Sequence, residues 1–176
     1  MRIELPGGHH LSGVGEGDRD AHVQLLADGE IAAFIPAIPQ PYTEESAEKW
    51  VRHRMEVARR GPEICFAIRD PAGRMVGSVG VDDLEVGSAH NGELGYWLAP
   101  AARGRGRANE AVRAFVPYAF GVLGLERLSA HTLYFNQPSI RVLERNGFVL
   151  EGRLRRFTRT STGLHDTLVF GLLEDN

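Results

Sequence analysis

The sequence predicts an α+β fold in which helices cover the faces of one mixed sheet. Three observations support this class. Segments whose apolar residues alternate are interspersed with segments whose apolar residues recur at helical spacing. The chain carries no internal repeat, low-complexity tract or linker. Its 176 residues suffice for one core of ordinary size, so we expect a single domain spanning residues 1–176.

The first half of the chain predicts a strand, two helices and a hairpin. Asp18 and Thr43 precede the helical segments and are typical N-cap residues. Three prolines between the helices predict a surface loop, because proline removes backbone donors and fixes φ. The predicted elements are a strand at 9–14, a helix at 19–27, a loop at 34–42, a helix at 44–60, and strands at 63–69 and 75–83 joined by a type I turn.

The second half predicts alternating strands and helices. Pro117 lies inside the first helix and is expected to kink or end it, since its ring removes a hydrogen bond and clashes with the preceding turn. Gly147 is expected to stop the second helix. The predicted elements are a strand at 93–98, a helix at 108–122, a strand at 128–133, a helix at 138–146 and a closing hairpin with strands at 149–157 and 165–173.

Composition and charge restrict the class of function. Twenty Lys and Arg residues against 23 Asp and Glu give a net charge of −3, which provides no overall field for holding nucleic acid. No stretch reaches the roughly 18 uncharged apolar residues of a membrane span. The N-terminal residues lack the apolar segment of a secretory signal, and the lone Cys65 cannot form an internal disulfide. We therefore expect a soluble cytoplasmic protein with no membrane, nucleic-acid or metal partner.

A basic, glycine-rich loop is the first candidate for chemistry. Residues 103–108, Arg-Gly-Arg-Gly-Arg-Ala, join the end of a predicted strand to the start of a helix. A helix N-terminus offers unpaired N–H groups, and residues without a Cβ let those donors approach a pyrophosphate closely. Arginines add charge-assisted bonds. The loop matches neither the Walker pattern nor the dinucleotide-fold spacing, and a plain basic surface turn is the alternative.

A second motif lies 33 residues further along the chain. Asn136, Ser139, Gly147 and Phe148 match an N-x-x-S/A…N/G-G-F pattern, and the loop matches Q/R-x-x-G-x-G/A. Together the two motifs resemble those of the GCN5-related N-acetyltransferase (GNAT) superfamily. The resemblance implies a twisted, mostly antiparallel sheet of six to seven strands with splayed central strands and helices on both faces. It also implies an acyltransferase that uses acetyl-CoA as its acyl donor.

Within the superfamily, the sequence resembles the branch of ribosomal-protein alanine acetyltransferases. The similarity rests on the segments at 93–98 and 150–152 and on Ser139. Family members commonly place a tyrosine seven residues after the asparagine, as general acid for the departing thiolate, but here that position is Leu143. The branch uses the serine instead. The resemblance therefore implies that Ser139 assists the thiolate by a hydrogen bond.

The resemblance also implies a set of binding and catalytic residues. Glu93, at the start of a strand leading to the donor site, is the candidate general base, acting directly or through water; a solvated strand-end carboxylate is the alternative. A backbone N–H near Leu98 would stabilise the oxyanion. The expected acetyl-CoA contacts are Trp97 and Leu98 at a strand edge, Arg103, Gly104, Arg105, Gly106, Arg107 and Ala108 in the loop, and Asn136 and Ser139 in the second motif.

The sequence leaves the identity of the acceptor amine open. The leading expectation is a protein or peptide N-terminus, and the nearest rival is a small amine such as an antibiotic, a polyamine or an amino acid. An open groove would favour peptides and a closed pocket would favour metabolites. A more remote alternative is a non-catalytic acyl-CoA-binding module. A homodimer is compatible with the sequence.

Overall fold

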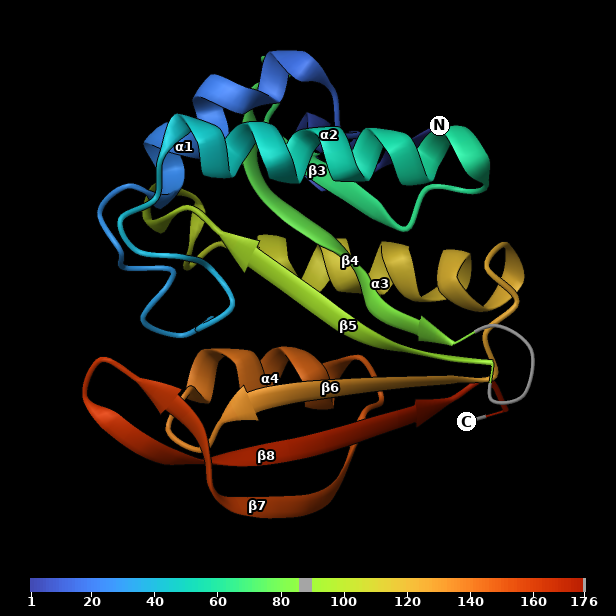
Figure 1. The fold of residues 1–176 in the computed structure, drawn as a ribbon. Helices are drawn as coiled ribbons and strands as arrows, with labels where there is room; N and C mark the ends of the chain where they lie inside the picture. The colour runs from blue at the N-terminus through green and yellow to red at the C-terminus, as the bar shows by residue number, and fades with distance from the viewer. Residues whose placement is uncertain (86–89, 176) are drawn as a thin grey trace.

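The computed structural model describes residues 1–85 and 90–175 (Figure 1). Within them, short 3-10 turns precede or link several of the main elements. The strands are β1 (Arg2–Glu4), β2 (His10–Gly13), β3 (Cys65–Arg69), β4 (Met75–Glu85), β5 (Asn91–Leu98), β6 (Arg127–Leu133), β7 (Val149–Thr160) and β8 (Gly163–Leu173). The α-helices are α1 (Arg19–Leu26), α2 (Glu44–Arg60), α3 (Arg107–Gly121) and α4 (Gln137–Arg145).

The strands form one eight-stranded sheet in the order β1-β2-β3-β4-β5-β6-β8-β7. Every neighbouring pair is antiparallel except β5 and β6, which are parallel. The predicted mixed, mostly antiparallel sheet is therefore confirmed, but the expected six to seven strands become eight. The strand without a counterpart in the sequence prediction is β1, whose three residues are too few to show alternation.

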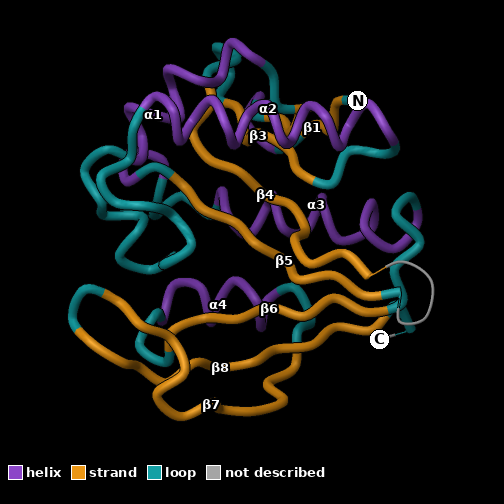
Figure 2. Tube along the Cα trace, viewed as in Figure 1, coloured by secondary structure: helices purple, strands orange, loops and turns teal. Residues whose placement is uncertain are grey.

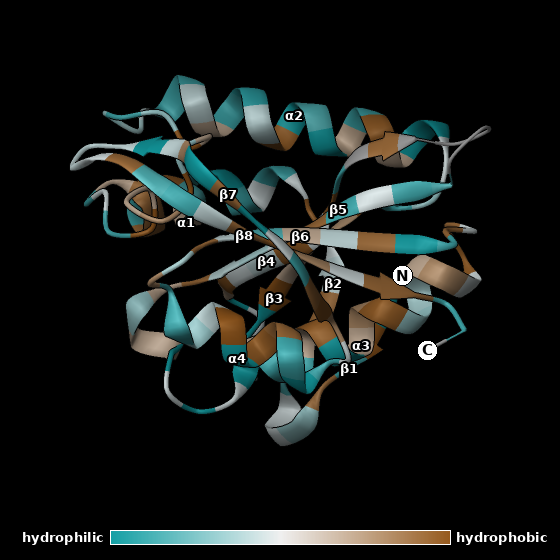
Figure 3. Ribbon diagram, turned by 90° about the horizontal axis from the view of Figure 1, so that it is seen from below, coloured by the Kyte–Doolittle hydropathy of each residue, from teal (hydrophilic) through white to brown (hydrophobic). Residues whose placement is uncertain are grey.

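Helices cover both faces of the sheet, as expected. Figure 3 shows α1 and α2 on one side of the strands and α3 and α4 on the other. The main core lies under α3, where Phe66 of β3 packs edge-on against Phe115 and Tyr118. The helical spacing of the apolar residues in α3 predicts that this face of the helix is buried. In the part of the chain that the structure describes, no helix combines the length and apolar character needed to cross a membrane.

Pro117 does not end α3, which was one of the two outcomes expected of it. The helix continues through Gly121. Pro117 lies on the exposed side of the helix, as does Arg113, the residue whose carbonyl loses its usual N–H donor. Water can reach that carbonyl, so the helix tolerates the missing bond.

Two predicted caps have different outcomes. Thr43 caps α2 as expected, because its Oγ1 accepts from the Ser46 N–H at 3.2 Å. Asp18 precedes α1 but makes no capping bond to it. Its buried carboxylate instead accepts from the Gly15 N–H at 2.9 Å and from the Arg69 guanidinium at 2.7 and 2.8 Å. The prediction was wrong because a charged partner on β3 outcompetes the local amides for the carboxylate.

The parallel strands β5 and β6 pair over only part of their length. Their ladder joins residues 91–93 to residues 127–129 and then stops. Beyond it the strands diverge, which Figure 2 shows as a widening gap between β5 and β6 toward their C-terminal ends. The splayed central strands are thereby confirmed. The opening leaves one edge of β5 without a strand partner, and the candidate site occupies this opening.

Candidate active site

A cavity of about 1020 Å³ occupies the opening between β5 and β6. Its lining includes the first turn of α3 and the first turn of α4, and also the loop before α2 and the β7–β8 hairpin. In Figure 1 that loop (blue) and that hairpin (red) lie at the same end of the molecule, at the C-terminal ends of β5 and β6. The cavity therefore joins the two predicted motifs to this loop and this hairpin.

The glycine-rich loop presents the start of α3 to this cavity. Gly106 is the N-cap residue, with φ of 78° and ψ of 0°, and Gly104 also has φ of 78°. Both residues need this left-handed conformation, which a Cβ disfavours. Gly106, Ala108 and Asn109 all line the cavity. The first N–H groups of α3 and the positive end of its dipole are therefore directed to a site where an anion can bind.

The three arginines of the loop do not all serve that anion site. Arg103 donates from Nε to the Leu98 carbonyl at 3.0 Å and forms an ion pair with Glu30. Arg107 donates to the Pro6 carbonyl at 2.9 Å and to Glu110 at 2.7 Å. Arg105 is exposed and is not among the residues that line the cavity. Arg103 and Arg107 thus line the cavity while their guanidinium groups are engaged by protein partners, whereas Arg105 lies outside its lining.

Two arginines that the sequence analysis did not single out also line the cavity. They are Arg141 and Arg145 of α4. They lie four residues apart, which places them on one face of the helix. Their spacing within the second motif was the signal that could have identified them.

The backbone of β5 alternates between its two neighbours. The Ala99 N–H donates to the Val76 carbonyl at 2.8 Å, which makes these residues a hydrogen-bonded pair of the antiparallel ladder. Two residues earlier, Trp97 also directs its backbone groups toward β4, so it does not present the free edge expected of it. Leu98 and Tyr96 direct theirs into the opening. Trp97 still belongs to the lining of the cavity.

Tyr96 is a site residue that the sequence analysis missed. Its hydroxyl lies 2.9 Å from Ser139 Oγ and donates to the Ser139 carbonyl at 3.2 Å. Burial raises the pKa of Tyr96 to about 12, so the phenol keeps its proton. Alternation along β5 was the available signal, because it places Tyr96 on the same face as Leu94 and Leu98.

The second motif holds Ser139 at the start of α4. The Asn136 side chain accepts from the Ser139 N–H at 3.4 Å and caps the helix. Leu143, at the position where the family pattern has tyrosine, is buried; its side chain contributes to the cavity lining but carries no acidic group. The structure therefore places a phenol near Ser139 from a different element, β5, than the one on which the family pattern places it.

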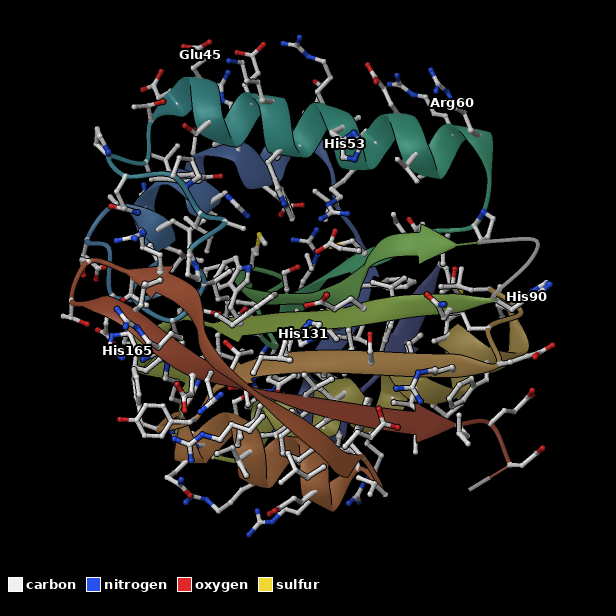
Figure 4. All side chains as sticks on the ribbon, turned by 60° about the horizontal axis from the view of Figure 1, so that its bottom comes forward. Glu45, His53, Arg60, His90, His131 and His165 are labelled. Carbon is white, nitrogen blue, oxygen red and sulfur yellow. The ribbon has the colours of Figure 1, made fainter. Side chains whose placement is uncertain are left out.

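Glu93 lies against an imidazole on the neighbouring strand. Its Oε1 is 2.9 Å from Nδ1 of His131, and both side chains are about one-third exposed, at 34% and 32%. Figure 4 labels His131 between β5 and β6. Both residues line the cavity. By strand alternation Glu93 and Trp97 face α1 and α2, whereas Tyr96 faces α3 and α4. Glu93 and Ser139 thus lie on opposite sides of the opening.

Aromatic side chains surround the outer end of the cavity. Phe34 and Phe135 have ring centroids 6.3 Å apart and are 40% and 41% exposed, and Phe157 is 62% exposed. They come from the loop before α2, the β6–α4 connection and β7. Large apolar surfaces at a cavity mouth are typical of a site that a second molecule covers.

A second cavity, of about 550 Å³, adjoins the first on the side of α1 and α2. His22 stacks on Trp50 with ring centroids 4.1 Å apart and contacts the Tyr42 hydroxyl at 2.7 Å. Burial lowers the pKa of His22 to about 4 and raises that of Tyr42 to about 12. Glu93 and Trp97 line both cavities. Residues 1–85 and 90–175 contain no cluster of three or more His, Cys, Asp and Glu side chains suited to a metal ion.

Comparisons with known proteins agree with this geometry. The family described as Acetyltransferase (GNAT) domain matches residues 10–149. YjcK, a probable N-acetyltransferase of Bacillus subtilis, is 33% identical over 133 residues, which cover 75% of this chain and 74% of the relative. The structure of ribosomal-protein-S5-alanine acetyltransferase from Vibrio fischeri is similar with a TM-score of 0.89 and 19% identity, covering 100% of this chain and 98% of that one.

A further solved structure is that of spermidine N-acetyltransferase from Vibrio cholerae in complex with CoA and spermine. It is similar with a TM-score of 0.82 and 19% identity, covering 96% of each chain. At these identities the two structural likenesses concern the fold. The family match and the Bacillus subtilis relative establish the family as well as the fold: this chain belongs to the GNAT acetyltransferase family. It is an enzyme of the acyltransferase class, an N-acetyltransferase.

Proposed function

We propose that this enzyme transfers the acetyl group of acetyl-CoA to the N-terminal α-amine of a protein or peptide. The observation that carries the proposal is the continuous cavity, which runs from the N-terminus of α3 to a mouth surrounded by exposed phenylalanines. One end has the features of an anion site and the other has an apolar surface that a polypeptide can cover. The solved relatives include an enzyme named for ribosomal protein S5.

The residues present fit acetyl-CoA. Its pyrophosphate would bind the first N–H groups of α3 from Arg107 onward, with Gly106 allowing close approach. Its pantetheine amides would pair with backbone groups of Tyr96 and Leu98, which lie at the unpaired edge of β5. Asn136 would act by holding the first turn of α4.

Transfer would proceed by direct attack of the amine on the thioester. The amine forms the C–N bond and the C–S bond breaks, with its electron pair leaving on sulfur. The Leu98 N–H would stabilise the oxyanion that forms in between. Glu93 would draw the proton from the acceptor, directly or through water. Ser139 would donate a hydrogen bond to the departing thiolate from the other side of the opening.

The chemistry of the acceptor favours an α-amine. At pH 7 roughly 10 to 15% of α-amines are neutral, whereas only about 0.04% of lysine amines are. A carboxylate base that is about one-third exposed therefore has to deprotonate an α-amine far less often than a lysine amine. The mouth is also lined by side chains from three separate segments, which suits an extended ligand better than a compact one.

A small polyamine is the second candidate, because two carboxylates face the acceptor side. Asp82 and Glu93 are directly opposite each other on β4 and β5, and both line the two cavities. Arg54 of α2 pairs with Asp82 at 2.6 Å and offsets part of that negative charge. A solved relative with this fold was crystallised with spermine.

A panel of amines separates these two functions. We would measure thiol release from acetyl-CoA with a peptide that has a free N-terminus, the same peptide blocked at the N-terminus but containing lysine, and spermidine. We expect acetylation of the free peptide alone, with mass spectrometry placing the acetyl group on its α-amine. A kcat/KM for spermidine ten times that of the free peptide would contradict the proposal.

Loss of the Ser139 hydroxyl should slow turnover without weakening donor binding. Replacing Ser139 by alanine is expected to lower kcat by about 10 to 100-fold, the low end of general-acid effects, because a hydroxyl stabilises a thiolate by hydrogen bonding rather than by proton transfer. Tyr96→Phe should cause a loss of similar kind, since the phenol contacts Ser139 Oγ. The acetyl-CoA Kd should change little in both variants. Unchanged kcat would reduce Ser139 to a helix-start residue.

A further inference from the structure

We infer that His131 is the group that takes the proton from the acceptor amine, and that Glu93 acts through it as a positioning residue. The inference rests on the proposed function and deepens it, because it replaces the water or direct contact between Glu93 and the amine by a named side chain. Three observations carry it: the contact of the two residues, the position of His131 in the lining of the cavity, and the balance of charge around the pair.

The contact fixes which ring nitrogen can act as a base. Glu93 Oε1 lies 2.9 Å from Nδ1 of His131, and because an ionised carboxylate only accepts hydrogen bonds, a hydrogen bond between them requires the tautomer with its proton on Nδ1. Nε2 then carries the lone pair. The ring is partly exposed and lines the cavity, and Nε2 is its nitrogen that does not contact Glu93. This arrangement of carboxylate, imidazole and reacting group is common to many enzymes that activate a nucleophile.

The pairing of β5 with β6 places Glu93 and His131 next to each other. Glu93 and Ser129 are partners in the short parallel ladder of β5 and β6, and His131 lies two residues beyond Ser129 on the same face. The two strands begin to separate at this point, so the side chains lie where the sheet opens into the cavity. The Phe157 ring lies beside the imidazole, with centroids 6.4 Å apart, and covers part of it.

The charges near His131 leave Glu93 as its direct partner. On β4, Asp82 is opposite Glu93 but is paired with Arg54 of α2. Along β6, Arg127 is paired with Glu151 of β7 at 2.9 Å. The residue opposite His131 on β8 is Val169, which carries no charge. The negative charge of Glu93 can therefore stabilise the imidazolium that forms when His131 accepts a proton.

The proton balance of the reaction closes with His131 as acceptor. A protonated amine gives one proton to Nε2 and attacks the thioester carbonyl as the neutral amine. After the C–N bond forms and the C–S bond breaks, the nitrogen loses a second proton. The thiolate takes up one proton and the other reaches solvent, which returns His131 to its neutral form. No oxidant, reductant or further reactant is required.

The test compares two acceptors that differ in charge. One is a peptide with a free α-amine, and the other is the same peptide carrying an aminooxyacetyl group, whose nitrogen is already neutral at pH 7. His131→Ala should lower kcat/KM for the first by about 100-fold at pH 7 and change the second by no more than about threefold. Added imidazole should restore part of the lost activity. Acetyl-CoA Kd and melting temperature should match those of the parent.

Two further variants complete the design. His53→Ala changes an exposed histidine on α2 (Figure 4) and should leave both acceptors unaffected. Glu93→Gln combined with His131→Ala should be no slower than His131→Ala alone, because a positioning residue has no effect once its target is gone. Equal losses for the two acceptors, or additive losses in the double variant, would overturn the inference.

Failure of this inference is distinguishable from failure of the proposed function. The parent enzyme is first assayed on the amine panel described above, and the His131 comparison uses whichever amine it acetylates together with a neutral analogue of that amine. A parent that prefers spermidine overturns the peptide proposal alone. A parent that acetylates the peptide and a His131→Ala variant with unchanged kcat/KM overturn the histidine inference alone.

Discussion

Replacing Gly106 by valine is expected to abolish acetyl-CoA binding, raising the Kd by at least about 1000-fold, or about 4 kcal/mol. Gly106 caps α3 with φ of 78°. A Cβ built on it would meet no protein atom within 4 Å, so the side chain would occupy the open space before the helix N-terminus. The pyrophosphate must enter that same space to reach the N–H groups of α3. Calorimetric titration with acetyl-CoA measures the effect.

Backbone strain has to be separated from blocked access, because a β-branched residue at positive φ costs about 1 to 2 kcal/mol by itself. Gly124 provides the matched control. It has φ of 66°, its added Cβ would also meet nothing within 4 Å, and it follows the opposite end of α3. Gly124→Val should lower the melting temperature like Gly106→Val but bind acetyl-CoA normally. Similar affinities in the two variants would show that the cradle lies elsewhere.

Local patterns were sufficient to predict most elements of this fold. The buried face of α3 at helical spacing, the cap at Thr43 and the alternation in β5 each depend on neighbours within a few residues. Two of the exceptions depend on contacts beyond the local sequence. Asp18 was assigned to a cap because nothing in the sequence shows that Arg69, 51 residues away, takes its carboxylate. The strand β1 exists only because β2 is available beside it.

Candidate site residues could be predicted where they belong to one sequence motif. They could not be predicted where they depend on contacts between two different elements. The glycine-rich loop and the start of α4 lie at the cavity as their motifs indicated. Tyr96 and His131 were missed because each was recognised only by its contact with a residue on another element. Tyr96 contacts Ser139 of α4, and His131 contacts Glu93 of β5. The register of a parallel pair joined through a helix cannot be read from either strand alone. The sequence analysis therefore singled out Glu93, which lines the cavity, without showing that it contacts His131.

Acid should destabilise the protein through His22, which is only 2% exposed. Desolvation by burial is the main reason why its pKa falls from 6.5 to about 4; the nearby Asp18 opposes this shift and Arg54 adds to it. The folded state thus resists a proton that the unfolded state accepts. Stability is unaffected by this group above pH 6.5 and decreases as the pH falls from 6.5 toward 4.

The magnitude follows from the displacement of the pKa. Each unit corresponds to about 1.4 kcal/mol, so the full shift amounts to about 3 kcal/mol, of which about 2 kcal/mol is lost between pH 7 and pH 5. This is a large part of the stability of an ordinary domain. Other groups also titrate in this range, so the measurement has to be a difference between the parent and a variant without the imidazole.

The double variant His22→Phe with Tyr42→Phe isolates this contribution. Phenylalanine at position 22 keeps an aromatic ring against Trp50, and the second change removes the hydroxyl that would otherwise lose its partner. Urea unfolding at pH 7 and pH 5 should show a loss about 2 kcal/mol smaller in the double variant than in the parent, while His53→Gln should behave like the parent because His53 is exposed. Equal losses in parent and double variant would mean that His22 already binds a proton in the folded state, and that its cavity admits the water needed to stabilise the charge.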